Sequence, residues 1–338
     1  MSSSTLVGAP PLVRSHRTAV RVPGAAAPYD TAHVTVRYPA LPAETDVERM
    51  SGMLRPDTAA APYPVVVLMP GINVSSAGYL DLAVALARRG LVAVTFDWVG
   101  ELFPGQHGLT PGVDVAAVGP DTYGTRPTTP VLRPLLDALA DANRGGPLAG
   151  ALDLARVGLF GHSAGGTVAL QSARPEWFPE VRAVAVYGAH TMASQQLGFP
   201  PGTLLAAPVV APAMLVAGTA DGVVAASAIR YGEEAGAPGH DPVERTWAEA
   251  LPGGHGAWLV RLAGAGHMLP ATPEDPTSAR GFLEEPAQAD QDHLREVLTE
   301  LLVTFFAARL DDDVAADAAL TALTDPATRP EIADARRR

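Results

Sequence analysis

Hydrophobic and polar positions in the first third of the chain show two periodicities, one typical of strands and one typical of helices. Residues 33–38, HVTVRY, alternate between apolar and polar side chains and predict a strand with one buried face, and residues 49–54 are predicted as a second short strand. Residues 63–71, YPVVVLMPG, form an apolar run that predicts a central strand buried on both faces. Residues 77–90 then place apolar side chains at helical spacing, and LVAVTFD at 91–97 returns to a strand. This order predicts a parallel pair of strands.

The alternation of strands and helices continues almost to residue 310. It comprises a helix at 131–142, a strand at 156–160, a helix from 164, strands at 182–188 and 211–218, a helix from about 223, a strand at 257–264 and a helix at about 289–309. The pattern predicts an α/β fold with a doubly wound, mostly parallel sheet, antiparallel N-terminal strands and helices on both faces. Because no repeat and no long linker interrupts it, we expect a single domain over residues 1–310 and a C-terminal appendage or tail at 311–338.

Three segments are too long and too rich in glycine and proline for ordinary connections: 99–129, 191–210 and 268–286. Each follows the end of a predicted strand. Loops at the carboxyl ends of parallel strands surround the crevice where such sheets bind ligands, so we expect these three to border an apolar pocket. Candidate lining side chains in or beside the loops are Trp98, Phe103, Tyr123, His190, Phe199 and Leu204.

The composition narrows the choice of partners and compartments. Of the 338 residues 47% are hydrophobic, the net charge is -12, and all 24 basic residues are arginine. An acidic chain without a basic stripe argues against nucleic acid or an anionic membrane surface as a partner. The absence of cysteine excludes disulfides, thiolate metal sites and a cysteine nucleophile. Because the sequence has neither the apolar core of a signal peptide nor a run long enough to span a membrane, we expect a cytoplasmic location.

A Gly-x-Ser-x-Gly motif lies between the predicted strand at 156–160 and the helix that follows it. Gly161 and Gly165 suit a sharp turn, because a Cβ atom at either position would crowd the reversal from strand to helix. The residue at the tip, Ser163, then carries its hydroxyl above the edge of the sheet. The pattern alone is weak in a chain with 33 glycines, but a strand before it and a helix after it make Ser163 a candidate nucleophile.

A serine hydroxyl attacks a carbonyl poorly unless a base removes its proton and an acid orients that base. Asp221 and His267 each follow a predicted strand further along the chain. The order Ser, Asp, His is the one expected when the nucleophile lies on such a turn, so we predict a catalytic triad of Ser163, Asp221 and His267. Asp97 is the alternative acid because it also follows a strand, and His255, which precedes the last strand, is the alternative base.

Attack on a carbonyl also creates an oxyanion, which needs hydrogen-bond donors that are already in place. The amide of Ala164, directly after the candidate nucleophile, is one expected donor because it lies at a helix N-terminus. The second donor should come from the loop after the first central strand. Ile72 is favoured there, and Gly71 or Asn73 would serve if the loop turned differently.

Four segments, GHSAGG, VVVLMPG, LVAGTAD and RLAGAGHMLP, together resemble the α/β-hydrolase superfamily over about residues 63–310. Within it the chain is similar to the branch of dienelactone hydrolases, chlorophyllases and bacterial cutinase-like polyester hydrolases. The resemblance implies the residues already singled out: nucleophile Ser163, acid Asp221, base His267, and oxyanion donors Ile72 and Ala164.

The function predicted is hydrolysis of a small-molecule or lipid-like carboxylic ester through an acyl-enzyme, without a cofactor. An acyltransferase or a thioesterase with the same triad is the alternative. A non-catalytic binding protein of the same fold is the alternative from another class, and it would be expected to lack a triad member. No glycine-rich phosphate loop indicates a nucleotide, and Glu101 with His107 are too few ligands for a metal site. The sequence leaves the oligomeric state open.

Overall fold

A computed structural model of the chain describes residues 11–103, 105–207, 209–234, 239–251, 256–277, 280–284 and 286–338. Its central feature is a nine-stranded sheet in the order β1-β2-β4-β3-β7-β8-β9-β10-β11, and β5 and β6 form a separate hairpin. The strands are β1 Val13–Arg21, β2 Thr31–Pro39, β3 Tyr63–Met69, β4 Val92–Asp97, β5 Val99–Phe103, β6 Gln106–Leu109, β7 Leu152–His162, β8 Val181–Tyr187, β9 Ala213–Gly218, β10 Trp258–Leu262 and β11 Ile332–Arg337.

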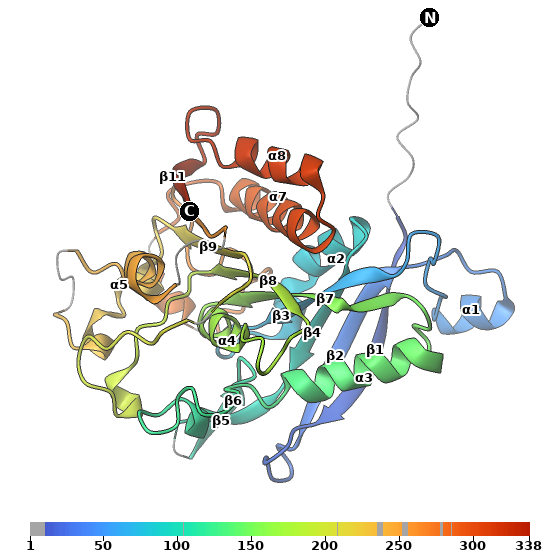
Figure 1. Ribbon diagram of the computed structural model, residues 1–338, viewed down its shortest axis with the longest axis horizontal. Coiled ribbons are helices and arrows are strands. Elements are labelled where there is room, and N and C mark those ends of the chain that lie inside the picture. The colour runs from blue at the N-terminus through green and yellow to red at the C-terminus, as the bar shows by residue number, and fades with distance from the viewer. Residues whose placement is uncertain are drawn as a thin grey trace, which may run out of the picture.

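The strands from β4 to β10 in the sheet pair in parallel, whereas β2 is antiparallel to β1 and β4, and β11 is antiparallel to β10. Helices α2 and α7 cover one face of the sheet, and α3 and α4 cover the other (Figure 1). The predicted α/β class, with a mostly parallel sheet and antiparallel N-terminal strands, is confirmed.

The helices differ widely in length. The α-helices are α1 Asp46–Ser51, α2 Leu80–Arg88, α3 Leu132–Gly145, α4 Ala164–Ser172, α5 Gly222–Ala225, α6 Pro242–Arg245, α7 Gln291–Leu310 and α8 Val314–Leu323. Short 3-10 or π-helical turns are η1 Ser76–Tyr79, η2 Val115–Ala117, η3 Gln195–Leu197, η4 Ala228–Tyr231, η5 Thr246–Ala250 and η6 Gly281–Leu283.

The core is divided between the two faces of the sheet, and β3 shows why its sequence is apolar without interruption. Val65 and Val67 pack in the cluster beneath α3 and α4, whereas Val66 and Leu68 pack in the cluster beneath α2 and α7. Successive side chains of a strand point to opposite faces, so a strand covered on both sides needs apolar residues at every position.

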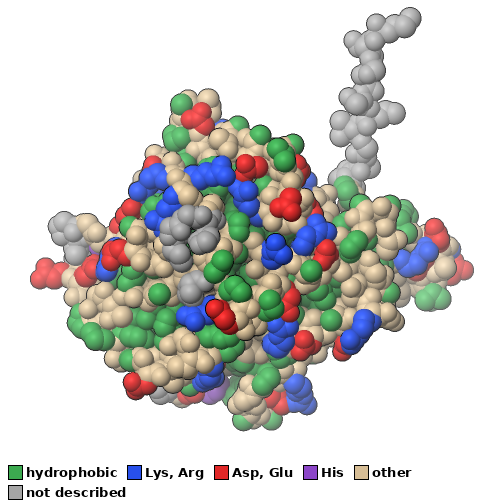
Figure 2. All heavy atoms as spheres, viewed as in Figure 1, with side chains coloured by type: hydrophobic (Ala, Val, Ile, Leu, Met, Phe, Trp, Pro, Cys, Tyr) green, Lys and Arg blue, Asp and Glu red, His purple; other side chains and the backbone are tan. Residues whose placement is uncertain are grey.

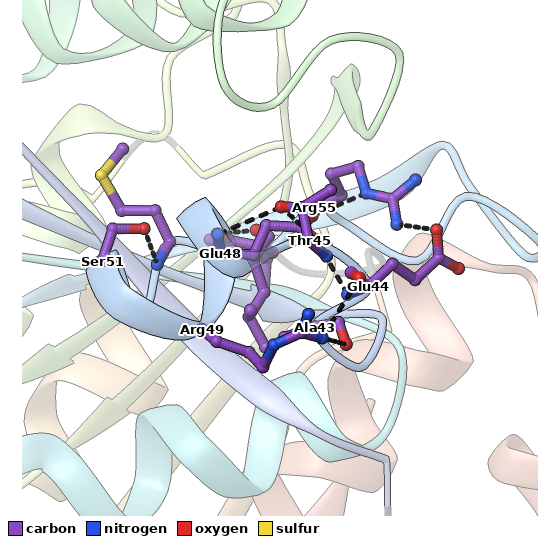
Figure 3. Close-up of polar contacts among 10 residues, drawn as sticks. Ala43, Glu44, Thr45, Glu48, Arg49, Ser51 and Arg55 are labelled. Atoms are coloured by element: carbon purple, nitrogen blue, oxygen red, sulfur yellow. Dashed lines mark hydrogen bonds and ion pairs between the residues drawn. The ribbon is translucent and has the colours of Figure 1, made fainter.

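Helix α1 replaces the strand predicted at residues 49–54, and that prediction is wrong. The side-chain oxygen of Thr45 accepts a hydrogen bond from the Glu48 amide (3.1 Å), and the Glu48 carboxylate accepts one from the Thr45 amide (2.9 Å), as Figure 3 shows. Hydrogen bonds from the amides of Thr45 and Glu44 and from the Arg55 side chain lower the pKa of Glu48 to about 2. This capping box fixes the start of a helix, and no part of the apolar pattern signalled it.

Both ends of the described chain add edge strands that the sequence did not predict. Strand β1 pairs with β2 along its full length. Strand β11 pairs with β10, and α8 packs against α7, which buries Leu320 and Ile332 in the same cluster as the core of α7. Residues 311–338, which we expected to form an appendage or tail, contain α8 and β11, and β11 completes one edge of the sheet.

Charged side chains of both signs are interspersed over the face of the molecule seen in Figure 2. In the part of the chain that the structure describes, no helix has both the length and the apolar character needed to cross a bilayer.

Candidate active site

Ser163 lies at the sharp turn from β7 into α4, which we call the elbow. Its backbone φ of 55° and ψ of -128° place it in a conformation that is strained for a residue with a Cβ atom. The flanking glycines allow the close approach: a Cβ at Gly161 would lie 2.4 Å from the Gly165 carbonyl oxygen, and one at Gly165 would lie 2.2 Å from that of Met69. The Ser163 amide donates to the Tyr187 carbonyl at 2.9 Å, so β3 and β8 hold the turn from two sides.

The structure brings Ser163, His267 and Asp221 into one hydrogen-bonded chain. Nδ1 of His267 lies 2.8 Å from Oδ2 of Asp221, and Nε2 lies 2.9 Å from Oγ of Ser163. Because the carboxylate only accepts, Nδ1 of the neutral ring carries the proton, and Nε2 is free to accept from the serine hydroxyl. The other carboxylate oxygen of Asp221 accepts the Val224 amide at 2.8 Å, and His267 and Asp221 are buried.

The alternative acid is occupied elsewhere. One carboxylate oxygen of Asp97 accepts the Ser76 amide at 2.8 Å and the other is bonded to the Ser76 hydroxyl, so Asp97 anchors the start of η1. His255, the alternative base, lies outside the residues that the structure describes.

The loop after β3 has one amide without an acceptor. The Gly71 amide donates to the Tyr79 hydroxyl at 2.9 Å, and the Asn73 amide donates to the Leu109 carbonyl at 2.8 Å. Within the described residues the Ile72 amide between them makes no hydrogen bond. Of the three candidates in this loop, Ile72 is therefore the one whose N–H is free for a ligand.

The elbow supplies a second free amide. Ala164 is the first residue of α4, and in the described part of the chain its N–H has no acceptor, as expected at a helix N-terminus. A Cβ built on Gly71 would lie 3.4 Å from the Cβ of Ser163, so the loop after β3 packs directly against the elbow. Ile72, Ser163 and Ala164 all line one cavity.

A buried chain of hydrogen bonds joins this loop to His267 through the elbow histidine. Nε2 of His162 lies 2.9 Å from the main-chain carbonyl of His267, and Nδ1 lies 2.8 Å from the Tyr79 hydroxyl. The carbonyl must accept, so Nε2 donates, Nδ1 accepts from Tyr79, and the Tyr79 oxygen accepts the Gly71 amide. Burial and the neighbouring His267 lower the pKa of His162 to about 3, which keeps the ring neutral in this role.

Tyr187 and Glu284 brace the segment around His267, and sequence reasoning did not single them out. The Tyr187 hydroxyl donates to the Gly266 carbonyl at 2.6 Å, and Oε1 of Glu284 accepts the Met268 amide at 2.6 Å. Burial raises the pKa of Tyr187 and of Glu284. In the sequence, Tyr187 is marked only by its polar hydroxyl after the aliphatic run at residues 183–186 of β8.

The cavity beside Ser163 has a volume of about 120 Å³. It is lined by the elbow, the loop after β3, the loop after β8, the segment from α5 to η4, and the loop after β10. Met192 and Arg280 enter it from two of the predicted long loops, 191–210 and 268–286. Among the described residues, the loop at 99–129 contributes no lining side chain.

Of the side chains predicted to line a pocket, His190 lines this cavity. The others lie elsewhere among the described residues: Trp98, Phe103, Tyr123, Phe199 and Leu204. Trp98 is buried and donates to a main-chain carbonyl, and Phe199 packs with Leu205.

Glu101 and His107 face each other across the β5–β6 hairpin. The Glu101 carboxylate accepts the Gly105 amide at 2.7 Å, and the His107 ring stacks on Tyr29. Over the described ranges, no group of three or more His, Cys, Asp or Glu side chains is arranged to hold a metal ion.

A mostly parallel sheet with a serine on a strained strand-to-helix turn, bonded to a histidine from a later strand end, defines the class of α/β proteins with a nucleophile elbow. Residues 66–336 match the model of the Alpha/beta hydrolase family, and the chain belongs to this family. Its general activity is accordingly that of a hydrolase. No protein of curated function matches the chain.

Proposed function

We propose that this hydrolase cleaves carboxylic esters, with Ser163 as nucleophile, His267 as general base and Asp221 as the group that orients the base. The observation that carries the proposal is the continuous chain from Oγ of Ser163 through His267 to Asp221, at 2.9 and 2.8 Å, beside two free amides. Those amides, of Ile72 and Ala164, are the proposed oxyanion donors.

In the proposed reaction Oγ of Ser163 attacks the ester carbonyl carbon while its proton passes to Nε2 of His267. The carbonyl oxygen becomes an oxyanion that the Ile72 and Ala164 amides stabilise. When the tetrahedral intermediate collapses, the C–O bond to the alcohol breaks, and the alcohol leaves with the proton from His267. Water then attacks the acyl-enzyme with the same histidine as base, and the carboxylic acid and free Ser163 are regenerated.

The cavity volume bears on the size of the substrate. A cavity of about 150 Å³ in a protein core holds a molecule the size of benzene. At about 120 Å³ the cavity beside Ser163 suits a short acyl or alcohol group next to the serine.

A fluorophosphonate probe and an ester panel test the proposal together. We expect the probe to label the peptide that contains Ser163 and p-nitrophenyl esters from acetate to octanoate to be cleaved, with short chains favoured. The Ser163→Ala variant is the control for both measurements. Labelling of another serine would refute the assignment of the nucleophile, and absence of both labelling and turnover would favour a non-catalytic binding protein.

A hydrolase, an acyltransferase and a thioesterase would all form an acyl-enzyme. The acceptor of the acyl group distinguishes the acyltransferase, and the preferred substrate distinguishes the thioesterase. With excess methanol or glycine methyl ester in the assay, a hydrolase releases mainly the free acid, whereas an acyltransferase releases mainly the new ester or amide. An acyl thioester of matched chain length, cleaved faster than the oxygen ester, would identify a thioesterase.

A further inference from the structure

Two arginines line the cavity beside Ser163. Arg230 lies in η4, nine residues after Asp221 in the sequence, and Arg280 lies in the loop after β10. Both are half-buried and both line the same cavity as Ser163. Neither residue belongs to a motif or a periodic segment, so sequence reasoning did not single them out.

Neither arginine has a carboxylate partner among the described residues, although most buried or half-buried arginines of this chain do. Both side chains line one cavity, and burial and the charge of Arg230 lower the pKa of Arg280. Like charges that converge in a partly desolvated site cost free energy unless an anion joins them.

Three carboxylates in or beside the segments that line the cavity are bonded to other groups. Asp221 is bonded to His267, Oε1 of Glu284 accepts the Met268 amide, and Glu233 is paired with His240. None of the three forms an ion pair with Arg230 or Arg280.

A neutral polar group, His190, also lines the cavity. Burial and the charges of His240, His267 and Arg230 lower the pKa of His190 to about 3, so its ring is uncharged near neutral pH. Nε2 of His190 lies 3.1 Å from the Tyr231 hydroxyl, and its Nδ1 atom is buried without a hydrogen-bond partner in the described part of the chain. The lining of the cavity thus includes two cations and an unsatisfied polar atom.

We propose that Arg230 and Arg280 form a subsite for an oxyanion on the substrate, so that the ester cleaved at Ser163 is a small ester that also carries a carboxylate or a similar anionic group. The proposal rests on the proposed ester hydrolysis for its reacting centre. Guanidinium groups present planar forks of N–H donors that match oxyanions, and their charge steers anions into the site despite the net negative charge of the chain.

Matched esters test the subsite in the full-length protein. 4-Acetoxybenzoate and methyl 4-acetoxybenzoate share the acetyl group and the ring and differ by one negative charge. We expect the wild type to have a higher kcat/KM for the anionic ester. The ratio of the two kcat/KM values should fall about tenfold or more in Arg230→Gln and in Arg280→Gln, as for loss of a charged hydrogen bond.

Two further arms sharpen this experiment. Arg182→Gln removes an exposed arginine of β8 and should leave the ratio unchanged. 4-Acetoxybenzenesulfonate, compared with 4-acetoxybenzoate, shows whether the arginines prefer a tetrahedral or a planar oxyanion. The subsite is refuted if the wild type has no preference for the anionic esters, or if the ratio survives in both cavity variants or falls equally in Arg182→Gln.

Binding to the Ser163→Ala variant separates failure of the subsite from failure of the proposed reaction. By calorimetry we expect 4-acetoxybenzoate to bind at least about tenfold more tightly than its methyl ester, and addition of Arg280→Gln to remove the difference. Equal binding of the two esters overturns the subsite even if the wild type is an esterase. Charge-dependent binding without any turnover by the wild type supports the subsite and overturns the esterase.

Discussion

Two chains of a serine, a histidine and a carboxylate reach the same cavity: Ser163, His267 and Asp221 form the first set, and Ser227, His240 and Glu233 form the second set. The serine oxygen lies 2.9 Å from the histidine in the first set and 3.1 Å in the second. The residue types and spacing are nearly the same, so they cannot by themselves decide which serine reacts.

The direction of the protons separates the two sets. Oγ of Ser227 donates its one proton to the Val224 carbonyl at 2.5 Å, so that proton is not directed at Nε2 of His240, which lies 3.1 Å from Oγ. In the first set the hydroxyl proton of Ser163 has Nε2 of His267 as its acceptor. The second set also lacks a strained elbow, because Ser227 has ordinary helical φ and ψ values. A triad is therefore defined by a serine proton directed at the histidine and by nearby free amides, as well as by its residue types.

The largest expected difference is between two single variants, in which one or the other serine is replaced by alanine. Ser163→Ala should lower kcat for a p-nitrophenyl ester by about 10⁴-fold or more, because the nucleophile is lost. Ser227→Ala removes a hydroxyl of the same size from the same cavity, and kcat should change less than about tenfold. Steady-state kinetics and fluorophosphonate labelling of both variants measure the difference, and comparable losses would contradict the distinction drawn between the sets.

The two carboxylates provide the second comparison. Asp221→Asn should lower kcat by about 10³- to 10⁴-fold, because an amide at this position cannot hold the Nδ1–H tautomer of His267. Glu233→Gln should have an effect below about tenfold, and so should Asp97→Asn, which alters the anchor of Ser76. Kinetics of the three variants with one ester give the ranking. If Asp97→Asn matched Asp221→Asn, the assignment of the orienting acid would be lost.

The hydrogen-bonded meeting of Ser163, Asp221 and His267 could be predicted because each follows a strand of one parallel sheet, whose carboxyl ends share an edge. The strands with apolar runs, β3 and β4, were also predictable, because burial on both faces requires such runs. The arginine pair was not predictable. Arg230 and Arg280 come from short turns without periodicity, and only the tertiary structure shows that neither has a carboxylate partner among the described residues.

The errors in the fold share a physical cause. Edge strands β1 and β11 carry many polar side chains because they are exposed along one side, so hydrophobic patterning is weak there. Helix α1 depends on the contacts of Thr45 and Glu48 rather than on periodicity. Local sequence specifies the buried interior of this sheet well, and long-range pairing specifies its edges.

A smaller effect should follow from loss of the hydroxyl that joins the first set to the loop after β3. Tyr79→Phe removes the donor to His162 and the acceptor of the Gly71 amide, and both partners are buried. We expect the free energy of unfolding to fall by about 1 to 3 kcal/mol, because buried polar groups lose their hydrogen bonds. Urea denaturation measures the loss.

The control for Tyr79→Phe is Tyr38→Phe, which removes a buried hydroxyl bonded to the Leu54 carbonyl. Neither Tyr38 nor Leu54 lines the cavity. Both variants should be destabilised, but kcat should fall, by several-fold, in Tyr79→Phe alone. Equal kcat values in the two variants would show that the chain through His162 stabilises the fold without positioning the oxyanion loop.

The smallest effect concerns His190, whose pKa is lowered by burial and by the histidines of both sets. Its pKa is about 3 in the folded protein and near 6.5 in the unfolded chain, so the unfolded chain binds the extra proton. The stability that a neutral His190 provides is therefore complete above pH 6.5 and is lost as the pH falls towards 3. Between pH 6.5 and 5, His190→Asn should reduce the pH dependence of the unfolding free energy by about 1 kcal/mol per pH unit. His162 makes a similar contribution in both proteins, so parallel curves for wild type and variant would mean that the pKa of His190 is the same in the folded and the unfolded chain. The ring would then be protonated in the fold below pH 6.5 and would add a third charge to the arginine pair.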